Sequence, residues 1–368
     1  MFAKDLIEMK LHIPGPVEVS QKTFRAMSMP MIGHRGQGFQ DLYAKIQPQL
    51  QELLGTRRKV LLGTCSAWGV MEGAIRNLCG RKLLCCMNGA FSDKWHDVAR
   101  RSGLVADALQ TEWGSPMLPK AIEARLSTGD YDALTIVHNE TSTGTMSPLA
   151  DIAALKEKYP EVMFIVDTVS SMSAMPLPFD ELGIDVMLAG TQKAFAMPPG
   201  LAVFVCSEAA LEKSARMPDR GYYFDLVEYQ KNAGKNMTPS TPSIAHINGL
   251  SSQLDVFHEE GLGNRYTRHT KLARMTRDWA TGHGFTLFPE EGSESLTLTC
   301  VNNGAKDGGR VVDVPRLCEL VGKKGFLIDG GYGKIKGTTF RLSNMGDETV
   351  ETMGKLYSAL DRALGELD

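Results

Sequence analysis

The sequence predicts an α/β protein, in which a large domain with a mostly parallel sheet covered by helices precedes a smaller α/β domain. Short apolar runs that stop at turn residues alternate with helical patterns between residues 59 and 205. Two of these runs, 163–166 and 186–189, have the length of strands buried in a parallel sheet. The 368 residues are enough for two domains. We place an arm at residues 1–20, the large domain at 21–250 and the smaller C-terminal domain at 251–368.

Composition excludes several classes of function. The net charge of −3 offers no basic field for nucleic acid. No apolar run reaches the roughly 18 residues of a membrane span, and the acidic residues near the start make a poor signal peptide. The seven cysteines form no CxxC pair, and their odd number argues against a secreted disulfide framework. We therefore expect a cytoplasmic protein with small-molecule substrates, no nucleic-acid or membrane partner, and no metal.

The expected elements follow one another in a regular order. Apolar residues at helical spacing predict a packed helix over 39–54. Strands of the large domain are expected at 59–62, 83–87, 133–138, 163–166, 186–189 and 201–205, with helices over 70–78 and 152–159. An aromatic, proline-containing segment at 221–242 is expected to be irregular. In the smaller domain, helical patterns cover 243–261, 266–283 and 351–364, and strands are expected at 296–301, 325–328 and 339–343.

An acid and an amine follow two neighbouring strands. Asp167 comes directly after the run 163–166, and Lys193 follows shortly after the run 186–189. Ligands of open α/β sheets bind at the carboxyl ends of the strands, so both side chains point to one crevice. The pair could form a structural salt bridge, or it could hold pyridoxal 5'-phosphate (PLP), which needs a lysine for its Schiff base and an acid beside its pyridine nitrogen. Burial and nearby positive charge would lower the lysine pKa and favour the free amine.

A second pattern suits a phosphate. The strand at 59–62 leads through a loop of small residues, which includes Ser66, Ala67 and Trp68, into the helix expected at 70–78. Unpaired backbone N–H groups and the helix dipole at such a helix start attract an anion. Ser66 adds a hydroxyl, and Ala67 is small enough to leave the N–H groups accessible.

Several ordered motifs together resemble a known family. They are Asp167-Thr168-Val169-Ser170-Ser171, Gly190-Thr191-Gln192-Lys193-Ala194 and Pro198-Pro199-Gly200. They resemble the class V aminotransferases of PLP fold type I, a group that includes alanine/serine–glyoxylate and phosphoserine aminotransferases. The resemblance extends from Pro14-Gly15-Pro16 to Phe340-Arg341-Leu342-Ser343, almost the whole chain. It implies the fold, transaminase activity, PLP as cofactor, and a homodimer with sites at the subunit interface.

The resemblance also implies residue roles. Lys193 and Asp167 would be catalytic, and the cofactor would contact Ser66, Ala67, Trp68, Phe91, Thr141, Asp167, Val169, Gln192, Lys193, Thr238 and Thr241. In that set Phe91 would stack on the pyridine ring, Thr141 would lie near the phenolic oxygen and Gln192 would support the phosphate. Thr241, with Thr238 as the weaker candidate, would reach the phosphate in the partner subunit. Arg341 would bind the substrate carboxylate through two parallel hydrogen bonds, and His34 and Arg35 would reach the substrate across the dimer.

The substrate stays open at this point. We expect a small amino donor, alanine or serine, with glyoxylate or pyruvate as acceptor. Phosphoserine with 2-oxoglutarate is the alternative, because His34-Arg35 could bind a phosphate. A cysteine desulfurase is more distant, because it would need a reactive cysteine and usually a histidine where this chain has Gln192. A degenerate fold that only binds or supports other molecules is disfavoured by the retention of Asp167, Lys193 and Arg341.

Overall fold

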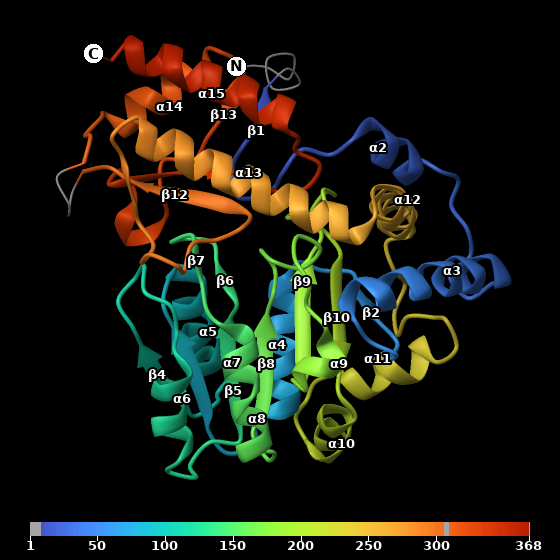
Figure 1. Ribbon diagram of the computed structural model, residues 1–368. Helices are drawn as coiled ribbons and strands as arrows, with labels where there is room; N and C mark the ends of the chain where they lie inside the picture. The colour runs from blue at the N-terminus through green and yellow to red at the C-terminus, as the bar shows by residue number, and fades with distance from the viewer. Residues whose placement is uncertain (1–8, 305–308, 368) are drawn as a thin grey trace.

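A seven-stranded sheet forms the centre of the computed structural model, which describes residues 9–304 and 309–367 (Figure 1). Its order is β2–β10–β9–β8–β5–β3–β4. The strands are β2 (Leu61–Gly63), β3 (Leu83–Met87), β4 (Ala106–Gln110), β5 (Ala133–Val137), β8 (Met163–Asp167), β9 (Val186–Gly190) and β10 (Ala202–Cys206). Only β10 runs antiparallel to its neighbours, while β9, β8, β5, β3 and β4 pair in parallel. The mostly parallel sheet is therefore confirmed.

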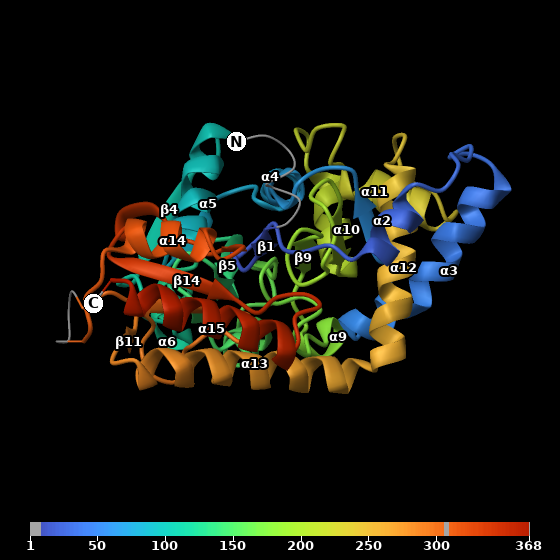
Figure 2. The ribbon, with the colours of Figure 1, turned by 90° about the horizontal axis from the view of Figure 1, so that it is seen from above.

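Helices cover both faces of this sheet, which explains the continuous apolar runs of its strands. In Figure 2, α4 (Ala67–Leu78), α5 (Ala90–Arg101) and α10 (Glu208–Arg216) lie along one side, and α6 (Pro119–Leu126) and α9 (Phe179–Leu182) lie along the other. Every residue of β3, β5, β8, β9 and β10 is buried. The edge strand β4 is partly exposed, and its mixed sequence was not recognised as a strand. A sheet buried on both faces needs apolar residues on each side of every strand, as found here.

Two regions differ from the sequence expectations. A helix, α11 (Leu226–Ala233), forms inside the segment expected to be irregular. Its start is fixed by the Asp225 carboxylate, which accepts hydrogen bonds from the backbone N–H groups of Val227 and Glu228 as a helix cap. The helix expected at 152–159 is divided into α7 (Leu149–Ala153) and α8 (Leu155–Lys158).

A second, smaller sheet lies above the carboxyl ends of the large one (Figure 1). It is antiparallel, with the order β11 (Thr286–Leu287), β12 (Leu298–Asn302) and β14 (Thr339–Ser343). The helices α13 (Leu262–Gly282), α14 (Val314–Gly322) and α15 (Val350–Gly365) enclose a separate apolar cluster around Phe340 and Leu356. The boundary predicted between residues 250 and 251 falls within α12 (Ile244–Glu260), which packs against α2 (Gln21–Met27) and α3 (Gln37–Leu54).

The arm joins the two parts of the structure. Residues 1–8 of the predicted arm lie outside the described residues. β1 (Lys10–Leu11) pairs in parallel with β13 (Phe326–Leu327) beside the small sheet. The chain then crosses to the large sheet, where the Val17 amide donates a 3.2 Å hydrogen bond to the Gln192 carbonyl. Among the helices of the described ranges, none combines the length and the apolar character needed to cross a membrane.

Candidate active site

Asp167 and Lys193 lie at the same edge of the large sheet. Their strands β8 and β9 are parallel neighbours, with Asp167 opposite Leu188. Lys193 follows in the loop after Gly190, where β9 ends. Both side chains are enclosed, with Asp167 3% and Lys193 7% exposed. The fold thus brings a carboxylate and an amine together in a space screened from water.

The environment of Lys193 favours the uncharged amine. Burial lowers its pKa to about 7, and the positive charge of Arg341 adds to this effect, while nearby carboxylates, Asp167 among them, oppose it. The Lys193 ammonium donates a hydrogen bond to the carbonyl oxygen of Pro14 in the arm. Its nitrogen also lies 5.8 Å from the centroid of the Phe91 ring. A large fraction of Lys193 is therefore a free, nucleophilic amine near neutral pH.

Asp167 is buried but hydrogen-bonded on both oxygens. Burial raises its pKa to about 7, and two hydrogen bonds oppose that rise. The Val169 amide donates to Oδ1 over 2.9 Å, and the Trp95 indole donates to Oδ2 over 3.4 Å. The ring of Trp68 lies 5.9 Å from that of Trp95. Trp95, which was not among the predicted site residues, thus contacts the acid directly.

Arg341 projects from β14 of the smaller sheet toward the same space. Its Nε donates to Asp329 Oδ1 over 2.8 Å, and its Nη1 donates to the Thr141 carbonyl over 2.7 Å. The Tyr332 ring centroid lies 5.3 Å from its guanidinium carbon. Within the described residues these bonds engage Nε and Nη1, so Nη2 is available to a ligand. A carboxylate is the planar partner that a guanidinium binds best.

The start of α4 meets the loop after β9. Ser66 occupies the helix cap position, and its side chain makes no capping hydrogen bond. Ala67 lies beside Gly190, since a Cβ added to that glycine would stand 3.4 Å from the Ala67 Cβ. Gln192 Oε1 is buried and has no hydrogen-bond partner in the described part of the chain. The uncapped helix start at this place fits a phosphate group, because its backbone N–H groups can donate to an anion.

Glu140 is a site residue that the sequence did not single out. Its side chain is completely buried, and its carboxylate accepts hydrogen bonds from the backbone and hydroxyl of both Ser92 and Ser142, and from the Phe91 amide. Next to it, the hydroxyls of Thr141 and Ser170 are hydrogen-bonded. Glu140 therefore fastens the start of α5, which carries Phe91, to the segment that carries Thr141. Glu140 directly precedes Thr141 in the sequence, and this position was the available signal. The sequence gives no way to infer that five donors would surround its carboxylate.

The other predicted residues form a separate cluster. Arg35 donates to the carbonyls of Thr238 and Pro239 over 2.7 and 2.8 Å. His34 Nε2 lies 3.4 Å from the Thr241 hydroxyl. The hydrogen bonds found for these side chains join them to one another, and none reaches Lys193, Asp167 or Arg341 within the described residues.

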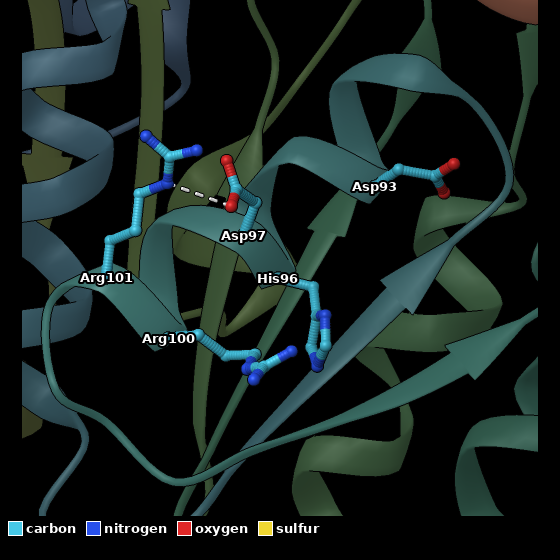
Figure 3. A pocket seen from close by; sticks show the side chains of 5 residues that line it. All are labelled: Asp93, His96, Asp97, Arg100 and Arg101. Carbon is cyan, nitrogen blue, oxygen red and sulfur yellow. Dashed lines mark hydrogen bonds and ion pairs between the residues drawn. The ribbon is translucent and has the colours of Figure 1, made fainter.

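A surface pocket of about 440 Å³ lies elsewhere, on α5 (Figure 3). Its walls are the side chains of Asp93, His96, Asp97, Arg100 and Arg101. Arg101 and Asp97 are paired over 2.9 Å, as the dashed line in Figure 3 shows. None of the five is a predicted site residue, so the pocket has no part in the site described above.

Comparison with known proteins decides the family. Residues 20–306 match the model of the family described as aminotransferase class-V. The chain belongs to this family. Class V aminotransferases depend on PLP, so this aminotransferase is a PLP enzyme of fold type I, as the resemblance implied.

Relatives cover nearly the whole aminotransferase. An uncharacterized aminotransferase of Methanocaldococcus jannaschii is 35% identical over 99% of this chain and 94% of its own. The L-aspartate–glyoxylate aminotransferase of Paracoccus denitrificans is 32% identical over 92% of this chain and 87% of its own. The serine–glyoxylate aminotransferase of Methylorubrum extorquens is 30% identical over 92% and 86%. A crystal structure of an alanine–glyoxylate aminotransferase from Nostoc superposes with a TM-score of 0.89 at 27% identity, covering 97% of this chain and 95% of that one.

The cysteines of the aminotransferase give no support to a desulfurase. Burial raises the pKa of Cys65 and Cys318 to about 11, and that of Cys79, Cys85, Cys206 and Cys300 to about 12. Burial raises the pKa of Cys86 as well. A nucleophilic cysteine needs a lowered pKa and an accessible thiolate, and all seven thiols show the opposite shift.

Proposed function

We propose that this aminotransferase moves the amino group of alanine or serine to a 2-oxo acid such as glyoxylate or pyruvate. One observation carries the proposal: Lys193, an enclosed amine with a pKa of about 7, lies close enough to the Asp167 carboxylate and the Arg341 guanidinium for both charges to shift that pKa. The relatives named for serine or aspartate, and the solved enzyme named for alanine, all share glyoxylate as acceptor, which supports the acceptor named here.

The residues around Lys193 fit PLP by their chemistry. When bound, PLP supplies an aldehyde that reacts with amines and a ring that withdraws electrons from the substrate. Asp167 would keep the proton on the pyridine nitrogen, Thr141 would donate to the phenolic oxygen, and Phe91 and Val169 would border the ring. Ser66, Ala67 and Trp68 would hold the phosphate at the helix start, and Gln192 would donate to it through its side-chain NH2 group.

Two side chains, Lys193 and Arg341, would perform the transfer. Lys193 would hold the cofactor through its side-chain nitrogen. As a free amine, Lys193 would also accept the proton of the donor Cα and return it later as a general acid. Arg341 would hold the donor carboxylate through Nη2, and Thr141 and Asp329 would keep the guanidinium oriented.

We also propose that two chains form a dimer with completed sites. The segment that precedes His34 and Arg35 in the sequence exposes four large apolar side chains, namely Phe24, Met29, Met31 and Ile32. Such a concentration of exposed apolar surface is typical of an interface. In the dimer, Thr241 and Thr238 would approach the phosphate of the partner site, and His34 and Arg35 its substrate.

Phosphoserine with 2-oxoglutarate is the second candidate substrate pair. The exposed cation of Arg35 beside His34 supports it, although both terminal nitrogens of Arg35 already donate to backbone carbonyls. Kinetics with serine and with phosphoserine separate the two candidates. If Arg35→Ala lowered only phosphoserine turnover, phosphoserine would become the better assignment.

Chemical labelling tests the main proposal. Borohydride reduction of the PLP-loaded enzyme, followed by peptide mapping, is expected to place the cofactor on Lys193. Lys193→Arg should take no label and lose transamination, while the matched control Lys213→Arg, at a lysine paired with Asp132, should keep both. A label on any other lysine, or wild-type enzyme inactive with both alanine and serine, would refute the assignment.

A further inference from the structure

The Tyr332 ring lies between two residues of the proposed site. It stacks on the Phe91 ring, with centroids 5.2 Å apart and an interplanar angle of 18°. The centroid of the same ring lies 5.3 Å from the guanidinium carbon of Arg341. Tyr332 is 43% exposed, so it stands at the mouth of the site rather than in the core. A rigid aromatic ring at this place borders the entry to the space between Arg341 and Lys193.

The loop that carries Tyr332 is held in position. Asp329 and Arg341 exchange backbone hydrogen bonds at its base, over 2.7 and 3.3 Å. Tyr332 is flanked by Gly331 and Gly333, whose φ angles of 88° and 60° favour glycine. A Cβ on Gly331 would stand 2.6 Å from Thr339 Oγ1, so this glycine is also required by space. The backbone on both sides of Tyr332 is therefore constrained, and its ring contacts Phe91 and Arg341.

The geometry of an amino acid brings its side chain to this ring. Amine, carboxylate and side chain all leave from one carbon, so a donor with its carboxylate on Arg341 and its amine toward Lys193 has little freedom in where the side chain goes. Phe91, which stacks on Tyr332, lies 5.8 Å from the Lys193 nitrogen. The Phe91–Tyr332 pair thus forms a wall beside the donor carbon. A methyl or hydroxymethyl group needs little room there, whereas a long or aromatic side chain needs the Tyr332 ring to move.

From this arrangement we infer that Tyr332 is a specificity-determining residue, whose ring restricts amino donors to those with small side chains. The inference rests on the proposed function, because it takes Arg341 and Lys193 as the groups that bind the donor. The substrate class that follows is defined by the size of the side chain of the amino donor. Neither Asp329, which orients Arg341, nor Phe91 alone closes the side of the site where Tyr332 stands.

Donor selectivity tests this inference. For wild type, Tyr332→Ala and Tyr332→Phe, kcat/KM is measured with alanine, leucine and phenylalanine as donors and glyoxylate as acceptor. Tyr332→Ala is expected to raise the leucine-to-alanine and phenylalanine-to-alanine ratios by at least about tenfold, the discrimination that a few methylenes provide. Tyr332→Phe keeps the ring and should keep the wild-type ratios within about threefold. Tyr332→Trp, with a larger ring, should lower both ratios.

A binding measurement gives a readout that does not depend on turnover. Dissociation constants of acetate and 3-phenylpropanoate, two unreactive carboxylic acids, are measured on the PLP-loaded enzyme by ligand-observed NMR. Tyr332→Ala should favour 3-phenylpropanoate over acetate relative to wild type. If Tyr332→Ala changes all donors and both acids by the same factor, the ring only supports packing and the inference is wrong. If wild type uses neither alanine nor serine, the proposed function itself has failed, which is a distinct result.

Discussion

The indole nitrogen of Trp95 donates a hydrogen bond to Oδ2 of Asp167 over 3.4 Å, from α5 to the end of β8. Trp95 is 1% exposed, so no water can replace this donor if it is removed. The bond favours the charged carboxylate and opposes the effect of burial on the Asp167 pKa. Trp95 is therefore in a position to set the protonation state of the acid.

Trp95→Phe is expected to raise the Asp167 pKa further and to weaken PLP binding about tenfold, since hydrogen bonds to charged groups contribute about 1.5–3 kcal/mol and this one is long. The PLP dissociation constant, measured by absorbance titration of the cofactor-free protein, checks this. Trp279→Phe is the matched control, because it removes an indole–carboxylate bond of 2.8 Å to Asp361 in the smaller domain. Equal PLP affinities in the two variants would contradict the assigned role.

Gly15→Ala is expected to damage the site through Lys193. Gly15 has a φ of 89°, and a Cβ there would stand 2.7 Å from Lys193 Cδ and 3.0 Å from the Gln192 carbonyl. Gly103→Ala is the control, because Gly103 has a φ of 77° and open space around its Cβ position. Both variants should lose about 1–2 kcal/mol of stability from backbone strain, but only Gly15→Ala should lower kcat/KM, by about tenfold or more. If both variants lost the same fraction of kcat/KM, backbone strain alone would explain the loss of activity.

Arg265→Met is expected to destabilise the protein by about 3–5 kcal/mol, because it leaves buried partners without their cation. Arg265 is fully buried and donates to the carbonyls of Ser173 and Ala194, the latter next to Lys193. Its Nη1 also pairs with Glu260 and Asp347. Urea unfolding measures the loss. Arg274→Met removes an exposed arginine from the same helix and should change stability by no more than about 0.5 kcal/mol.

The cofactor-free protein should show a minimum in the stability contributed by Asp167 and Lys193 near pH 7. The Asp167 pKa rises from 3.8 to about 7 on folding, so the folded state binds more protons in that range and stability falls as pH rises through it. The Lys193 pKa falls from 10.5 to about 7, so the unfolded state binds more protons above pH 7 and stability rises with pH.

Two variants separate these contributions in thermal unfolding between pH 4 and 10. Asp167→Asn should remove the falling part of the curve below pH 7, and Lys193→Met should remove the rising part above it. Both variants should melt at a higher temperature than wild type at pH 7, since each removes a buried charge. An unchanged curve in Lys193→Met would mean that the lysine is not the group that titrates there.

Sequence patterns located the ends of β8 and β9, and with them Asp167 and Lys193, because short apolar runs and turn residues are local signals. Arg341 lies in the middle of β14, and its role was predicted from the family resemblance alone. Trp95 and Glu140 could not be assigned in this way. Their contacts join α5 to β8 and to the segment after β5, and pairings between distant elements leave no trace in spacing. The burial of Arg265 was unpredictable for another reason. An arginine on a helix normally faces solvent, whereas the Arg265 guanidinium is buried because two carbonyls and two carboxylates bind it.

The arm has a consequence for the order in which this enzyme can be made. Strand β1 leaves the ribosome long before its partner β13, because the two strands lie far apart in the sequence. Pro14, which accepts the Lys193 hydrogen bond, follows that strand directly. Until β13 has been made, the nascent protein must therefore carry a β1 strand without its partner, so the arm can dock only after most of the large domain has been synthesised.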